Sequence, residues 1–341
     1  MPRFLIPTRN RPAPLRELLR FLVRFYPGTS LLLADGSDDQ MKSEVQEVVA
    51  AHGDGLDIRY SEYPADLPFF ERMLDAVCQA EDEYLALGAD DDFPLVEAYD
   101  EAQEVLISRE DVVTVVPCDV VLTQAALGKL SARLSHSRSI LMRSPLARAR
   151  NFAWWSFATS YGVTLRDVLI ERYRMLAKYN CPGFIDFQVG INDAISGRIL
   201  ASDGIGTIRT QTYQHGYYRP TQPLVYLRHA ERILAYRDHV AGHLMETGLK
   251  EAEAMQSASN LVDRRVAELT GQSAPTRHGF RDTPGFNQLV LQEQYRKFYA
   301  MFEEGNDVRP VIEERLRYVA DILTSGIAVQ TQDKVENYET I

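Results

Sequence analysis

The chain has 341 residues, of which 45% are hydrophobic and 25% charged, a composition typical of a globular protein with room for two domains. Its formal net charge of −11 argues against general nucleic-acid binding, which needs a basic face that displaces counterions. A local basic pocket for a diphosphate stays compatible with this charge, because the potential at a site depends on the nearest groups.

The cysteines and the N-terminal segment bear on the cellular compartment. Cys78, Cys118 and Cys181 lie far apart without CxxC spacing, which favours free thiols in a reducing compartment over disulfides or a zinc site. The first apolar run is too short for a signal peptide, and no stretch approaches the roughly 20 apolar residues that span a bilayer. We therefore expect a cytoplasmic protein, with peripheral attachment to a membrane left open.

In the N-terminal third, short apolar runs alternate with segments of helical spacing. The expected strands are residues 3–8, 30–34, 57–60, 83–87 and 111–117, and the expected helices are 15–25, 41–51, 69–80 and 96–107. Alternation of this kind predicts βαβ units and a doubly wound, mostly parallel sheet. Ligands bind to such sheets beyond the carboxyl ends of the strands.

The rest of the chain has a weaker strand signal. Residues 122–182 indicate mostly helix, and residues 184–200 are expected to be helical until Gly197. After a proline-rich break, residues 224–341 have the spacing of several amphipathic helices. We therefore expect an α/β domain over residues 1–222 and a helical extension over residues 223–341. That extension could pack on the first domain, form an acceptor groove or form a homo-oligomer interface, since amphipathicity does not distinguish these roles.

Polar residues follow three of the expected strands. The sequence TRNR follows the first strand, ADGSDD closes the second, and ADDDF closes the strand at residues 83–87. Because parallel strands end at the same edge of a sheet, the three segments together locate a ligand site. Neither GxGxxG nor GxxxxGK[ST] follows these strands, which argues against a dinucleotide oxidoreductase and a P-loop enzyme.

The run Asp90-Asp91-Asp92 is the strongest single feature. Adjacent carboxylates repel one another unless a cation or another positive group lies nearby. Carboxylate oxygens suit Mg²⁺ or Mn²⁺, which take one or two carboxylates together with substrate phosphate oxygens. The alternative is a solvated acidic turn that caps the next helix. The preceding strand favours the metal site because it directs the run to the ligand edge of the sheet.

Other candidate residues have weaker signals. Asp35 could hydrogen-bond a base or a ribose, or serve only as a turn residue. Arg9 and Arg11 could bind a base or a diphosphate through planar, bidentate donors, or be exposed helix-capping residues. His215 could complete a metal shell or contact a phosphate, although a structural loop histidine is the more common role.

The segment after residue 184 contains two candidates for a general base. Asp186 could remove the proton from an attacking acceptor hydroxyl, and an N-cap is its structural alternative. Asp193 competes for the catalytic role, because it lies roughly two helical turns further along and on a similar face.

Taken together, these motifs resemble the inverting glycosyltransferases of the GT-A fold, of the family 2 type. IPTRNRP resembles the opening strand and its T-x-N-R element, and LLLADGSDD resembles the strand ending in D-D-G-S, with Ala34 in place of the first acid. EDEYLALGADDDF resembles the strand into the DXD motif. FIDFQVGINDAISGRI resembles the E-D segment, with Ile185 in place of Glu. The resemblance ends near residue 220.

The resemblance implies a Rossmann-like nucleotide-sugar-binding domain that takes a UDP-, GDP- or dTDP-sugar donor with Mn²⁺ or Mg²⁺. The acceptor would be a hydroxyl of a glycan, a lipid-linked molecule or a protein. By position in the motifs, the site residues would be Thr8, Arg9, Arg11, Asp35 and Asp90 for the nucleotide, Asp91 with Asp92 for the metal, and Asp186 as the base. His215, which lies outside these motifs, is a further candidate metal ligand. The DXD register also permits Asp92 as the principal metal ligand.

Two other functions stay open. A sugar nucleotidyltransferase would carry a glycine-rich loop after the first strand, where this chain has TRNRPAP without glycine. A non-catalytic nucleotide-sugar-binding protein would fit the missing Glu before Asp186 and the long helical extension.

Overall fold

The computed structural model describes residues 1–124, 130–135, 137–155, 157–181, 184–212, 229–269 and 308–324. The chain divides into two compact units, Met1–Gly216 together with Ile322–Ile341, and Tyr217–Asp321. The sheet and all the candidate residues named above, apart from His215, are described within the first unit. His215 lies outside the described residues.

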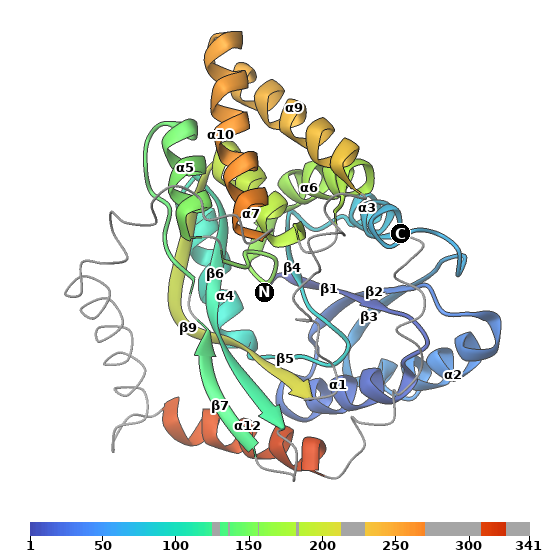
Figure 1. The fold of residues 1–341 in the computed structure, drawn as a ribbon. Coiled ribbons are helices and arrows are strands. Elements are labelled where there is room, and N and C mark those ends of the chain that lie inside the picture. Colours follow the sequence, from blue (N-terminus) through green and yellow to red (C-terminus); the bar gives the residue numbers. More distant parts are fainter. Residues whose placement is uncertain are drawn as a thin grey trace. The chain divides into compact units, whose positions relative to one another are not determined.

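Four parallel strands form the N-terminal half of the sheet, in the order β3-β2-β1-β4 (Figure 1). The strands are β1 (Arg3–Thr8), β2 (Ser30–Asp35), β3 (Asp57–Glu62) and β4 (Tyr84–Leu87), and the helices that connect them are α1 (Pro12–Phe25), α2 (Asp39–Ala50) and α3 (Phe69–Gln79). In β1 and β2, nearly every side chain is buried, as a strand covered on both faces requires. Pro12 begins α1 at a position where the missing N–H costs nothing.

The second half of the sheet mixes directions. It contains β5 (Phe93–Pro94), β6 (Val112–Gln124), β7 (Leu130–Ser135), β8 (Val163–Leu165) and β9 (Arg198–Thr212), with α4 (Val96–Ser108), α5 (Pro145–Trp155), α6 (Arg166–Tyr179) and α7 (Ile185–Ser196). The sheet continues from β4 as β8-β6-β9-β5, and β7 pairs with β6. Among the described strands β8, β5 and β7 oppose the direction that the other six share. The expected α/β class with a mostly parallel sheet is confirmed.

Residues 122–182 differ from the mostly helical expectation. They include α5 and α6, but also β7 and β8. β8 has three residues, which is too short for a period-2 pattern to be visible in the sequence. It belongs to the sheet because it pairs with both β4 and β6, neither of which is adjacent to it in sequence.

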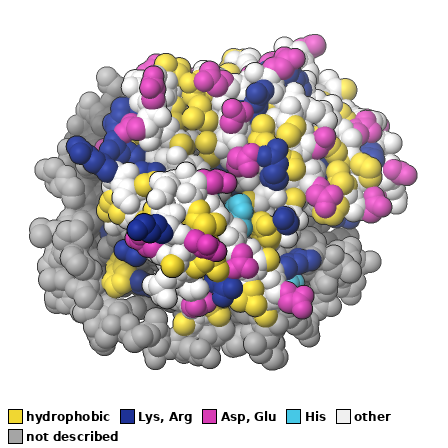
Figure 2. Space-filling model, turned by 90° about the horizontal axis from the view of Figure 1, so that it is seen from above, with side chains coloured by type: hydrophobic (Ala, Val, Ile, Leu, Met, Phe, Trp, Pro, Cys, Tyr) yellow, Lys and Arg dark blue, Asp and Glu magenta, His cyan; other side chains and the backbone are white. Residues whose placement is uncertain are grey.

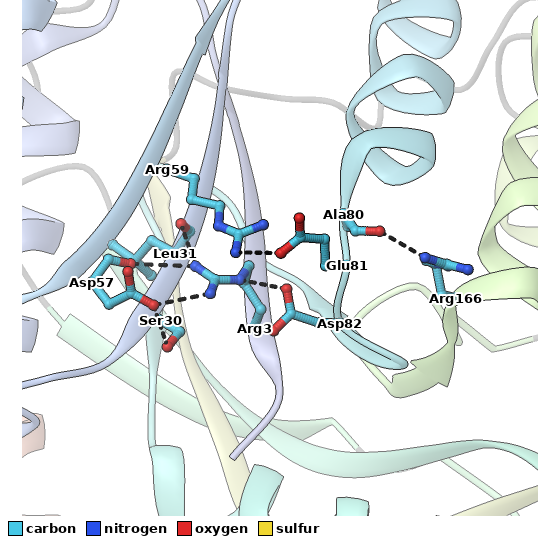
Figure 3. A network of polar contacts seen from close by, with 9 residues as sticks. All are labelled: Arg3, Ser30, Leu31, Asp57, Arg59, Ala80, Glu81, Asp82 and Arg166. Carbon is cyan, nitrogen blue, oxygen red and sulfur yellow. Dashed lines mark hydrogen bonds and ion pairs between the residues drawn. The ribbon is translucent and has the colours of Figure 1, made fainter.

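A polar network fixes the amino ends of the first strands (Figure 3). The buried Arg3 guanidinium contacts Asp57 Oδ2 at 2.9 Å and Asp82 Oδ2 at 2.6 Å. Arg59 pairs with Glu81 at 2.8 Å beside it. Arg3 begins β1 and Asp57 begins β3, so the network lies at the edge opposite the polar strand ends. These ion pairs link the first residues of the strands and have a structural role.

The second unit is described as helices. α9 (Ala230–Glu246) and α10 (Glu251–Leu269) pack on each other, and Gly248 adopts φ +98° in the short connection between them. α12 spans Val308–Thr324, of which residues 308–321 belong to this unit and residues 322–324 to the first. None of the described helices combines the length and the apolar character needed to cross a membrane. On the face in Figure 2, acidic, basic and hydrophobic side chains of the described residues are interspersed.

Candidate functional site

The polar ends of β1, β2 and β4 meet at one edge of the sheet. Thr8 and Asp35 are register partners at the ends of β1 and β2. The Thr8 hydroxyl donates to Asp90 Oδ2 at 2.8 Å, and the Gly36 N–H donates to the Thr8 carbonyl at 3.1 Å. Three segments that are far apart in sequence are therefore joined by direct hydrogen bonds.

Arg11 neutralises part of the acidic turn, Asp90–Asp92. Its guanidinium contacts Asp90 Oδ1 at 2.5 Å and Asp91 Oδ2 at 2.6 Å. Burial alone would lower the pKa of Arg11, but the attraction of these carboxylates outweighs it and raises that pKa. Burial raises the pKa of Asp90 above its ordinary range, while Arg11 opposes the shift. Asp91 is the most exposed of the three carboxylates, with 35% of its side chain accessible.

A second set of groups holds Asp92 from the other side. The Tyr161 hydroxyl donates to Asp92 Oδ2 at 2.7 Å, and the Thr210 N–H donates to Oδ1 at 3.1 Å. Arg209 on β9 lies 3.7 Å from Asp92 and 3.7 Å from Asp119 on β6. The Arg209 guanidinium carbon also lies 4.6 Å from the centroid of the Tyr161 ring.

The carboxyls on this side are poorly hydrated. Burial raises the pKa of Asp119 to about 7, although Arg209 opposes the shift. The pKa of Asp92 is also raised, mainly by burial and then by the charge of Asp91. Asp119, Tyr161 and Arg209 could not be predicted from the sequence, because no motif spacing links them to the acidic turn.

Asp35 is fully buried, and its carboxylate accepts three hydrogen bonds. Its Oδ1 accepts from the Ser37 N–H at 2.8 Å and from the Ser37 hydroxyl at 2.5 Å. Its Oδ2 accepts from the Tyr60 hydroxyl at 2.7 Å. The Asn10 N–H, in a residue with φ +55°, donates to the same Ser37 hydroxyl at 2.8 Å. These hydrogen bonds join the TRNR segment (residues 8–11) to the DGSD segment (residues 35–38), and the two segments together form one polar wall.

Arg72 on α3 contacts this wall, and no pattern in the sequence predicts it there. Its side chain is 4% exposed, and its Nη1 donates to the Thr8 carbonyl at 2.9 Å. Within the described part of the chain its Nε has no hydrogen-bond partner. Burial lowers the pKa of Arg72, while the charge of Asp35 opposes that shift. A Cβ added at Gly36 would lie 1.8 Å from Arg72 Nη1, so a side chain at position 36 would displace the Arg72 guanidinium. Arg9 is exposed and acts on the pKa of Arg72 as a like charge.

The two candidate bases on α7 have different environments. Asp186 lies in the first turn, is exposed, and is among the charges that raise the pKa of Arg209. Asp193 is fully buried and its Oδ2 contacts Arg172 Nη2 at 2.8 Å and the Thr159 hydroxyl at 2.9 Å. Of the two, only Asp186 is accessible to solvent.

The acidic turn fits a divalent cation only together with a ligand. Among the described residues no three His, Cys, Asp or Glu side chains form a ready-made cation site. Mg²⁺ needs only one or two protein carboxylates when phosphate oxygens and water supply the remaining ligands. Asp91 meets that requirement, since it is partly exposed and Arg11 contacts only one of its two oxygens.

Comparison with known proteins gives a likeness of fold. No family model and no curated protein sequence matches the chain. The structure of S. aureus TarS 1-349 superposes with a TM-score of 0.52 at 15% identity, covering 98% of this chain and 92% of that one. TarS 1-349 in complex with UDP-GlcNAc gives 0.52 and 15%, covering 97% and 92%. Whole TarS gives 0.51 and 15%, covering 98% of this chain and 56% of that chain. This chain therefore has the mixed α/β fold of these glycosyltransferase structures.

Proposed function

We propose that the protein transfers a sugar from a nucleotide-sugar donor to an acceptor hydroxyl, with a divalent metal and with inversion at the anomeric carbon. The observation that carries the proposal is the junction of the acidic turn with the carboxyl ends of β1 and β2 through Thr8 and Arg11. Ligands of doubly wound sheets bind at that edge. The likeness to TarS, solved with UDP-GlcNAc, supports a nucleotide-sugar donor.

The nucleotide would bind against the wall formed by the TRNR and DGSD segments. Asp35 would orient the base or the ribose, with Tyr60 and Ser37 fixing its carboxylate. Arg72 would support this surface from within, since its Nη1 donates to the Thr8 carbonyl. Arg9, which is exposed, would attract the diphosphate. A UDP-, GDP- or dTDP-sugar is the expected donor.

Asp91 would hold the Mn²⁺ or Mg²⁺, with Asp90 directed to the ribose and Asp92 supporting the turn. When bound, the cation supplies charge neutralisation for the departing diphosphate. The charges of the site support this assignment, because, among the residues that the structure describes, four carboxylates (Asp90, Asp91, Asp92 and Asp119) contact two cations, Arg11 and Arg209.

Asp186 would act as the general base. Its carboxylate would accept the proton of the acceptor hydroxyl while that oxygen bonds to the anomeric carbon and the bond to the diphosphate breaks on the opposite face. Inversion follows from this single displacement. The exposure of Asp186, against the complete burial and ion pairing of Asp193, supports this choice between the two.

The first test is thermal stability against a panel of nucleoside diphosphates, each with and without Mn²⁺. A ligand at a hundredfold its Kd stabilises the native state by about 2.7 kcal/mol. We expect one diphosphate to stabilise the wild type only with metal, and Asp91→Asn to remove the effect. Asp54→Asn, at an exposed aspartate outside the site, should respond like the wild type. An equal response of Asp91→Asn would contradict the metal assignment.

The sugar nucleotide identified in this way is then incubated with glycan, lipid-linked and protein acceptors. Sugar transfer with release of the diphosphate is the expected result. Donor binding without product for any acceptor would favour a non-catalytic nucleotide-sugar-binding protein. Release of pyrophosphate from a nucleoside triphosphate and a sugar phosphate would instead identify a nucleotidyltransferase.

A further inference from the structure

A tight turn, Thr159–Gly162, lies between the acidic turn and α7. The Gly162 N–H donates to the Thr159 carbonyl at 3.1 Å and closes the turn. Gly162 packs directly on β6, where an added Cβ would lie 2.5 Å from the Thr114 hydroxyl and 2.9 Å from the Val115 carbonyl. Because this approach leaves no room for a side chain, the turn has little freedom to shift on the sheet.

Two hydroxyls of this turn reach carboxylates on different elements. The Thr159 hydroxyl donates to Asp193 Oδ2 on α7 at 2.9 Å. The Tyr161 hydroxyl donates to Asp92 Oδ2 in the acidic turn at 2.7 Å, and its ring lies against Arg209. Hydrogen bonds to ionised carboxylates are short and strong, so both contacts resist displacement.

Asp193 anchors the C-terminal part of α7, and this determines where the N-terminal turn of the helix points. Asp186 precedes Asp193 by about two helical turns, so the two side chains project from a similar face of the helix. Any rotation of α7 about Asp193 would therefore redirect Asp186. Misplacement of a reacting group by about 1 Å can lower a rate about a hundredfold.

We infer that Thr159 and Tyr161 are positioning residues that fix the base helix relative to the acidic turn, through the chain Asp193–Thr159–Tyr161–Asp92. The inference rests on the proposed transfer reaction. Neither hydroxyl needs to touch a substrate, because each acts through the carboxylate that it holds.

The test compares kcat and the donor KM of Tyr161→Phe and Thr159→Val with those of the wild type. Tyr161→Phe keeps the ring against Arg209 and removes only the hydroxyl. We expect each variant to lower kcat by about tenfold, the effect of roughly one charge-assisted hydrogen bond, with less than about a threefold change in donor KM. Thr159→Ser keeps a hydroxyl and should restore most of the rate.

The matched control is Tyr26→Phe, which removes a tyrosine–carboxylate hydrogen bond of the same 2.7 Å length, from the residue that follows α1 to Glu97 on α4. It should leave kcat unchanged. Melting curves of all variants identify any that fail to fold. In the double variant of Thr159 and Tyr161, kcat should fall no further than in the worse single variant, since both interrupt one chain.

Three results would overturn the inference: normal kcat in both single variants, a loss confined to donor KM, or multiplied losses in the double variant. Failure of the proposed function is distinguishable, because it would appear in the wild type as the absence of transfer from any nucleotide-sugar.

Discussion

Substitution of Asp119 by Asn should change how the stability of the protein depends on pH. Asp119 is 13% exposed on β6, and burial raises its pKa from 3.8 to about 7. The folded state therefore binds this proton more tightly than the unfolded chain does. The stabilisation is fully present below the unfolded pKa and is lost as the pH rises through about 7.

The magnitude follows from the two pKa values. Between about pH 5.5 and about pH 8, the proton linkage of Asp119 removes about 2 kcal/mol from the free energy of unfolding. Asn cannot titrate, so Asp119→Asn should lack this loss. The comparison uses only the change in the free energy of unfolding with pH. Any effect of the amide on packing that does not depend on pH therefore cancels.

Urea unfolding followed by tryptophan fluorescence measures the effect, because both tryptophans, Trp154 and Trp155, lie on α5 in the same unit as Asp119. Nucleotide and metal are left out of the buffer. The exposed Asp54→Asn variant serves as control and should follow the pH dependence of the wild type. Equal pH dependence in the wild type and Asp119→Asn would refute the assigned pKa and its cause.

Three further substitutions test other parts of the site. Asp186→Asn should lower kcat by about a hundredfold or more in initial-rate assays and leave nucleoside diphosphate affinity unchanged; near-normal turnover would place the base elsewhere. Arg172→Met leaves a carboxylate buried without its ion pair and should lower the urea-measured free energy of unfolding by about 3–5 kcal/mol, whereas a loss below about 1 kcal/mol would contradict that pairing. Gly36→Ala forces Arg72 aside and should weaken calorimetric nucleotide binding at least about tenfold, while Gly53→Ala, where nothing lies within 4 Å of the added Cβ, should not.

The sequence by itself determined the N-terminal half of the fold and the edge where its polar residues gather. The expected strand at residues 3–8 coincides with β1, and the polar runs after β1, β2 and β4 are in contact. These features could be predicted because each depends on local pattern: a buried parallel strand is an apolar run, and its carboxyl end lies at the ligand edge of the sheet.

Only the tertiary structure decided what surrounds the acidic turn. Thr210 and Asp92 are 118 residues apart in sequence, and Arg209 and Asp119 are brought together by the pairing of β9 with β6. No local periodicity encodes such contacts, since they depend on which strands become neighbours. Likewise, helical spacing places Asp186 and Asp193 on a similar face of α7. Only the tertiary structure buries Asp193 against Arg172 and Thr159 and leaves Asp186 exposed.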